Sequence, residues 1–224
     1  MLSFSNTEIA FSAKTDKDLK WSEFLFKLIA RPWLVKLGKS LLLFALKIRL
    51  PIEGLIKKTA FPLFAGGESI NDCDSTVLSL AGHQVKTVLA YSVEAKEVDE
   101  DFERSTEETI ATIIRAKNDD NIPFAVFKPT SLASFAILER AGSRRKLSEE
   151  EQKTFDKVRE RFDRICKAAY EKDVPIQVDA EESWIQDAID ELTTEMMAKY
   201  NKEKAIVYNT IQLYRHDRLA FLKE

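Results

Sequence analysis

Four polar side chains stand where apolar runs of the sequence end. Glu94 closes the segment VKTVLAYSVE, Lys128 follows IPFAVF, Asp179 follows VPIQV, and Gln212 comes shortly after AIVYN. If these runs are parallel strands of one sheet, their carboxyl ends lie at one edge, where the βα loops of barrel enzymes gather catalytic groups. A lysine, two acids and an amide at that edge predict a polar pocket above an apolar floor.

Lys128 has the sharpest local signal of the four. Pro129 follows it and restricts the backbone of Lys128 to an extended geometry. A lysine held in this way can pair with a substrate carboxylate or form a Schiff base with a carbonyl substrate. The alternative is a surface lysine that packs its aliphatic stem on the protein and keeps its charge in water.

The acids and the amide also have structural alternatives. Asp179 can cap the helix that follows it or join an ion pair, and Gln212 can be a solvated residue at a helix start. Glu181 and Glu182, which come next in DAEESW, are predicted to stabilise the N-terminal turn of the following helix through its dipole.

The composition excludes several classes of site and of partner. The formal net charge is -3, so there is no global electrostatic case for nucleic acid. The two histidines and the distant Cys73 and Cys166 show no HxH, HExxH or CxxC spacing, so we expect no metal site and no disulfide. GxGxxG and GxSxG are absent, which counts against a Rossmann dinucleotide site and an α/β-hydrolase nucleophile. The start does not resemble a signal peptide, and we expect a cytoplasmic location.

Short apolar runs that alternate with amphipathic segments must position these residues. From about Val85 onward, this alternation predicts an α/β fold whose parallel strands are covered on both faces. Four such units predict either a doubly wound sheet or the first half of a (βα)8 TIM barrel. The longest helix pattern starts at SEEE, where Ser148 and Glu151 fit a capping box. It carries one apolar stripe, which consists of Phe155, Val158, Phe162, Ile165 and Ala169.

The N-terminal part of the chain has a different character. We predict a helical region over residues 1–64 and the partial barrel, with about four βα units, over residues 65–224. Between Lys27 and Lys58 there are eight basic residues and one acid, Glu53, and prolines divide the run into short helices. These helices either pack on the βα region or lie on an anionic membrane surface.

Five segments resemble the proline dehydrogenase family in their order and spacing. They are FAGGES, YSVEAKE, VFKPTS, VDAEESW and YNTIQLYRHDR, and the last two are the most specific. The resemblance runs from about residue 64 to the C-terminus and is to the monofunctional type with an additional N-terminal helical region. It implies a distorted (βα)8 barrel that holds FAD and oxidises L-proline to Δ1-pyrroline-5-carboxylate in proline catabolism. Electrons would pass to a membrane quinone.

The same resemblance implies a role for each strand-end residue. Lys128 would hold the proline carboxylate, and Asp179 would organise hydrogen bonds near the flavin and the substrate. Gln212 would bond the pyrimidine edge of the flavin, and Glu94 would ion-pair across the mouth of the site and gate it. Two features depart from the family pattern: Ala90 stands where an aspartate is usual, and PTSLAS stands where glycines are usual.

The length of the chain predicts half a barrel. Four βα units cannot close a ring of eight, so we expect a fragment or truncated chain that lacks the later catalytic groups and is inactive alone. Its open sheet edge predicts self-association, and its basic helices predict peripheral contact with the inner face of a membrane. The alternatives are a non-catalytic half-barrel interaction module and an aldolase-like Schiff-base lyase that uses Lys128.

Overall fold

The computed structural model describes residues 5–91, 97–143 and 145–223. The chain divides into two compact units, residues 1–85 and 86–224. Residues 65–85 fall in the first unit, and the boundary expected after residue 64 stays a prediction. No helix among the described residues is both long enough and apolar enough to cross a bilayer.

The first unit consists of helices whose starts follow local signals. Thr15 and Asp18 form a capping box before the second helix, each side chain accepting the backbone N–H of the other residue at 3.2 Å. Pro32 opens the third helix at a position where its missing N–H costs nothing. The elements are α1 (Thr7–Ala10), α2 (Asp16–Ile29), α3 (Pro32–Lys47), α4 (Glu53–Thr59), α5 (Phe61–Phe64), η1 (Asn71–Cys73) and α6 (Asp74–Ala81).

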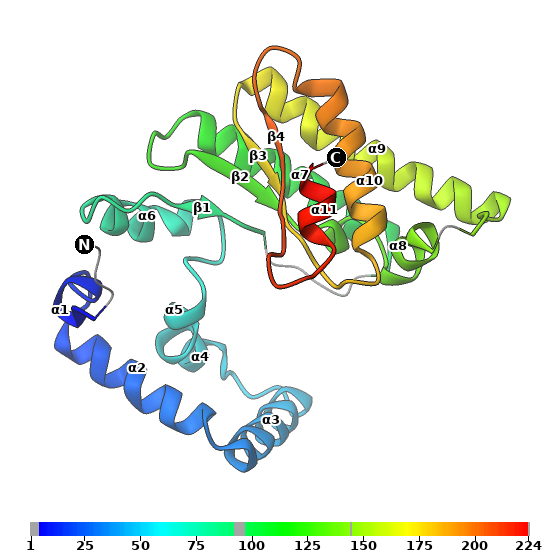
Figure 1. Ribbon diagram of the computed structural model, residues 1–224. Helices are drawn as coiled ribbons and strands as arrows, with labels where there is room; N and C mark the ends of the chain where they lie inside the picture. Colours follow the sequence, from blue (N-terminus) through cyan, green and yellow to red (C-terminus); the bar gives the residue numbers. More distant parts are fainter. Residues whose placement is uncertain (1–4, 92–96, 144, 224) are drawn as a thin grey trace. The chain divides into compact units, whose positions relative to one another are not determined.

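The second unit is built on one sheet of four parallel strands in sequential order (Figure 1). The strands are β1 (Val88–Leu89), β2 (Phe124–Phe127), β3 (Ile176–Val178) and β4 (Val207–Asn209). Helices connect them: α7 (Asp99–Lys117) precedes β2; η2 (Pro129–Ser131), α8 (Phe135–Gly142) and α9 (Glu149–Lys172) precede β3; α10 (Gln186–Tyr200) precedes β4; and α11 (Arg218–Lys223) follows it.

This strand order confirms the predicted α/β fold with parallel βα units. A doubly wound sheet reverses its strand order at a switch point, whereas the order β1-β2-β3-β4 has no reversal and is that of a barrel wall. The capping box at Ser148 and Glu151 is present, with the Ser148 N–H donating to Glu151 at 2.7 Å. The local helix signals are therefore confirmed where they are strongest.

The core lies between the sheet and α7, α9 and α10. The Phe127 ring packs edge-to-face on Phe162 of α9, with ring centroids 5.1 Å apart. Every residue of the predicted α9 stripe is buried, as are the alternate strand residues Ala125, Phe127, Ile176, Val178 and Val207. The register-matched residues of the opposite face, Val126, Gln177 and Tyr208, are only partly buried or exposed.

The expectation that both faces of the sheet are covered is therefore wrong for the described residues. Helices α7, α9 and α10 pack against the face of the sheet that carries the buried strand residues, as on the outer wall of a barrel (Figure 1). Two helix starts also differ from expectation. The sequence predicts a short helix over residues 132–139 and a last helix that begins near Tyr214, but α8 begins at Phe135 and α11 begins at Arg218. In both places a short hydrogen-bonded turn follows the strand and delays the helix.

Candidate active site

The ends of β2, β3 and β4 lie next to one another at one edge of the sheet. Lys128 directly follows β2, Asp179 directly follows β3, and Gln212 comes three residues after β4. The backbone N–H of Asp179 donates to the carbonyl of Phe127 at 3.0 Å, which ties the first two ends together. Three of the predicted site residues thus come from adjacent strand ends, and Glu94 lies outside the described residues.

Lys128 has the extended backbone that the following proline imposes. Its φ and ψ angles are -96° and 126°, and the side chain is partly buried. Its carbonyl accepts hydrogen bonds from the backbone N–H of Ser131 at 2.9 Å and from the Ser131 hydroxyl at 2.6 Å. The turn over Pro129–Ser131 therefore holds the peptide group that follows Lys128 in a fixed position.

Glu181 is the acid that connects this turn to the β3 end. Its carboxylate accepts the Thr130 N–H at 2.8 Å and the Thr130 hydroxyl at 2.5 Å. Burial raises the pKa of the Glu181 carboxyl above its usual value, although the two Thr130 donors and the charge of Lys128 act in the opposite direction. The capping position of α10 is Ile185, so Glu181 does not serve the first turn of that helix as the sequence had suggested.

Gln212 uses one end of its side-chain amide and leaves the other unpaired. Its Nε2 donates to the backbone carbonyl of Glu181 at 2.8 Å. Its Oε1 is buried and has no hydrogen-bond partner within the described residues. A buried acceptor without a donor is costly in a protein interior, so this oxygen marks a place where a donor from outside these residues fits.

Asp179 is partly buried, but its carboxylate makes no hydrogen bond or ion pair within the described part of the chain. The explanation of Asp179 as the cap of the next helix is wrong, because Ile185 holds that position. The polar connections at this edge run through Glu181 instead. The role of Asp179 toward flavin and substrate stays a prediction.

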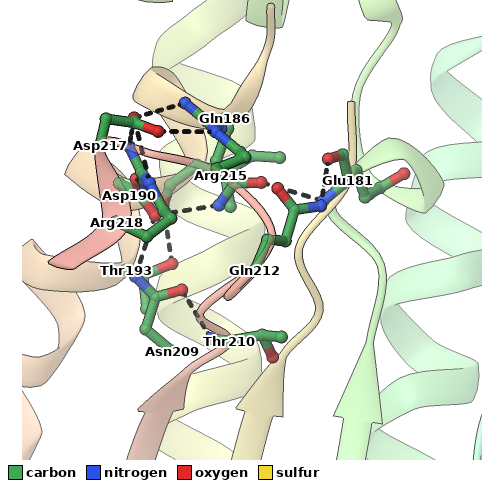
Figure 2. A network of polar contacts seen from close by, with 11 residues as sticks. Glu181, Gln186, Asp190, Thr193, Asn209, Thr210, Gln212, Arg215, Asp217 and Arg218 are labelled. Atoms are coloured by element: carbon green, nitrogen blue, oxygen red, sulfur yellow. Dashed lines mark hydrogen bonds and ion pairs between the residues drawn. The ribbon is translucent and has the colours of Figure 1, made fainter. Parts of the chain in front are cut away.

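A network of buried polar contacts continues from Glu181 into α10 and α11 (Figure 2). The Glu181 N–H donates to Gln186 Oε1 at 2.9 Å, and Gln186 Nε2 donates to Asp190 at 2.9 Å. Asp190 forms an ion pair with Arg218, and their side chains are 7% and 6% exposed. Asn209, the last residue of β4, also donates to Asp190 at 3.0 Å.

The sequence reading missed Gln186, Asp190 and Arg218. Gln186 and Asp190 are four residues apart and lie beside the apolar stripe of α10, a spacing at which two buried polar side chains can meet. That spacing could have indicated a buried polar pair within α10. The sequence gives no such signal for Arg218, because it lies in a different helix, α11. Among the described residues, no group of three or more His, Cys, Asp or Glu side chains is arranged to hold a metal ion.

Comparison with known proteins identifies what this chain is similar to. The carbapenem antibiotics biosynthesis protein CarD of Pectobacterium carotovorum subsp. carotovorum is 34% identical over 190 residues, which cover 84% of this chain and 50% of CarD. The mitochondrial proline dehydrogenase 1 of Dictyostelium discoideum is 29% identical over 212 residues, 78% of this chain and 37% of that protein. The chain thus spans half or less of the length of these two relatives.

A solved structure and a family model also match this chain. The crystal structure of proline utilization A (PutA) from Bdellovibrio bacteriovorus, inactivated by N-propargylglycine, matches with a TM-score of 0.59 and 19% sequence identity. The match covers 81% of this chain and 19% of that one, and it concerns the fold alone. The family model described as proline dehydrogenase matches residues 73–224. The chain therefore belongs to the proline dehydrogenase family.

Proposed function

We propose that this chain supplies the first half of a FAD-dependent active site that oxidises L-proline to Δ1-pyrroline-5-carboxylate. The family membership supports the reaction class. The observation that carries the assignment of the site is the meeting of Lys128, Asp179 and Gln212 at adjacent strand ends. The later strands of a closed barrel would complete the pocket.

The residues of this edge fit a flavin. The pyrimidine ring of a flavin carries an N–H donor beside two carbonyl oxygens, and the unpaired Oε1 of Gln212 is an acceptor of the kind that this N–H requires. FAD, when bound, supplies the oxidising power for hydride removal from the ring carbon beside the proline nitrogen. The chain itself holds Gln212 in place through the bond from its Nε2 to Glu181.

Lys128 is the group that we assign to the substrate carboxylate. It is partly buried at the end of β2, and a charge-assisted bond from a held ammonium group is stronger there than in water. We assign the partly buried carboxylate of Asp179 to a hydrogen bond near the reacting centre, and Glu94 to the mouth of the site. The protein's contribution is then positioning and electrostatics.

A flavin-binding experiment tests this proposal. The chain is mixed with FAD, freed of excess ligand, and its visible absorption spectrum is recorded. We expect bound flavin with wild type and at least tenfold weaker binding after Gln212→Leu, which removes both amide contacts. Gln152→Leu, an exposed position on α9, is the matched control. Absence of flavin absorption, even with a longer chain that contains the later strands, contradicts the proposal.

A second candidate concerns the metabolic role and not the chemistry. The name of CarD places that relative in carbapenem antibiotics biosynthesis. The same oxidation of a proline-like ring would then serve a biosynthetic route instead of proline catabolism. Steady-state rates with L-proline and with ring-substituted prolines separate the two, because a catabolic enzyme should prefer L-proline itself.

We also propose that the first unit contacts an anionic membrane surface, where a quinone can accept the electrons. None of the residues of α1 to α5 is buried. Helix α3 presents Trp33, Leu37, Leu41 and Phe44 along one side, between 50% and 62% exposed, and its only charged residues are lysines. An exposed apolar stripe beside basic side chains fits the interface of an anionic bilayer.

Vesicle co-sedimentation tests this contact. We expect binding to vesicles that contain phosphatidylserine, weaker binding at high salt, and little binding to phosphatidylcholine alone. Replacing Lys36, Lys39 and Lys47 with alanine should weaken binding on the order of 100-fold, from about 1 kcal/mol per lysine near the surface. The control replaces three exposed lysines of the second unit, Lys153, Lys202 and Lys223. Equal loss in both variants, or binding that ignores salt, contradicts the electrostatic contact.

A further inference from the structure

Glu181 is held at its carboxylate, its backbone carbonyl and its backbone N–H by groups from other parts of the chain. Its carboxylate accepts two hydrogen bonds from Thr130 in the turn after β2. Its backbone carbonyl accepts the Nε2 of Gln212, from the loop after β4, at 2.8 Å. Its backbone N–H donates to Gln186 at the start of α10 at 2.9 Å (Figure 2). Glu181, in the loop after β3, therefore contacts the segments that follow both neighbouring strands.

The bonds to Thr130 fix the turn that carries Lys128. Thr130 is 2% exposed, and its N–H belongs to the peptide group directly after Pro129. On the other side of the proline, the Lys128 carbonyl is held by Ser131. With both peptide groups around Pro129 held, the direction in which Lys128 leaves the backbone is determined.

The bond to Gln212 fixes the orientation of its amide. An amide group is planar, so a hydrogen bond at Nε2 leaves little freedom for the direction of Oε1. That bond is also the one hydrogen bond of the Gln212 side chain within the described residues. The position of the Glu181 carbonyl therefore decides where the unpaired Oε1 points.

We propose that Glu181 is a positioning residue that couples the substrate side of the site to the cofactor side. Its carboxylate holds the Lys128 turn and its carbonyl orients the Gln212 amide, so the two groups keep a fixed mutual position. This inference rests on the proposed function, which assigns Lys128 to the substrate and Gln212 to the flavin.

The surroundings of Glu181 suit a rigid connection. Gln186, which accepts its N–H, is 1% exposed and is itself held by Asp190. Asp190 is held in turn by Arg218 and by Asn209 of β4. Because every member of this chain of contacts has its partners, it supports Glu181 from the α10 side, and the two bonds from Thr130 support it from the side of β2.

The test compares Glu181→Ala with Glu181→Gln and with the neighbouring Glu182→Ala. Alanine removes both bonds to Thr130, so the Glu181 backbone loses its support from the turn after β2 and the carbonyl that orients Gln212 can shift. Glutamine retains the bonds to Thr130, because its oxygen can accept the N–H and its NH2 can donate to the hydroxyl. We expect Glu181→Ala to raise both the Kd for FAD and the KM for L-proline roughly tenfold, the usual scale for loss of a supporting contact. We expect Glu181→Gln to restore most of both, and Glu182→Ala to leave both within about twofold of wild type.

Three outcomes overturn the proposal. One is a Glu181→Ala variant whose Kd and KM stay within twofold of wild type. Another is an equal loss in Glu182→Ala. The third is a rise in Kd without a rise in KM, or the reverse, because a coupling residue must affect both sides. These measurements use a chain that also contains the later strands of a closed barrel, because the proposed pocket requires them.

A second measurement does not depend on flavin. Hydrogen exchange of the Thr130 amide, followed by mass spectrometry in the chain without ligand, should speed up at least tenfold in Glu181→Ala and not in Glu182→Ala. If wild type binds no FAD, the proposed function fails, and this exchange rate alone decides whether Glu181 holds the turn. If Glu181→Ala does not fold, Thr130→Val, which removes only the hydroxyl bond, takes its place.

Discussion

The buried ion pair between Asp190 and Arg218 allows the sharpest prediction about stability. Their side chains are 7% and 6% exposed, and Arg218 contacts one carboxylate oxygen of Asp190. The other oxygen accepts hydrogen bonds from Gln186 and Asn209. Asp190→Asn keeps the size of the side chain and lets its oxygen accept those two bonds. It places an NH2 donor against the donors of Arg218.

The structure sets the size of the expected loss of unfolding free energy. Breaking one partner of a buried ion pair costs about 3–5 kcal/mol, because the remaining charge stays buried. Arg218 keeps a second partner, Asp217, at 2.6 Å, but Asp217 is 52% exposed and such pairs contribute only about 0–1 kcal/mol. We therefore expect Asp190→Asn to lower the free energy of unfolding by about 3 kcal/mol, near the lower limit.

Urea denaturation of wild type and variant measures this loss. Asp187→Asn is the matched control, because Asp187 lies on the same helix and is exposed. The double variant Asp190→Asn, Arg218→Met removes both charges and keeps the oxygen that accepts from Gln186 and Asn209, so it should lose less than Asp190→Asn alone. A loss below about 1 kcal/mol in Asp190→Asn would refute the reasoning, since it would mean that Arg218 is not buried against this carboxylate.

Three further predictions concern single side chains. The pKa of Glu181 is higher in the folded chain than in the unfolded chain, so the contribution of Glu181 to stability falls as pH rises above about 4.3. Glu181→Gln should remove that part of the pH dependence of the unfolding free energy. Identical pH profiles for wild type and variant contradict this. Ser148→Ala should cost about 1 kcal/mol of unfolding free energy through loss of the α9 cap, and a change no larger than that of an exposed serine counts against it. Burial raises the pKa of both thiols, but Cys166 is fully buried and Cys73 is not; a thiol reagent should label Cys73 first in the native protein, and equal rates are the contrary result.

Local sequence signals were enough to predict the regular elements. The α9 helix could be predicted because its apolar stripe lies within its 24 residues and its cap, Ser148, directly precedes them. The starts of α8 and α11 could not, because both depend on turns whose stability comes from distant contacts. Thr130 is held by Glu181, which is 51 residues away in the sequence, and Arg218 is held by Asp190 at a separation of 28.

The sequence alone is enough to predict that polar residues follow successive parallel strands, because the alternation of apolar runs and helices places the strand ends at one edge. It could not determine which acid of DAEESW connects those ends. Asp179 and Glu181 are two residues apart and chemically alike, so the pattern favours neither. The choice was made by packing: it brings Thr130 and Gln212 against Glu181, and their hydrogen bonds exist only in the folded arrangement.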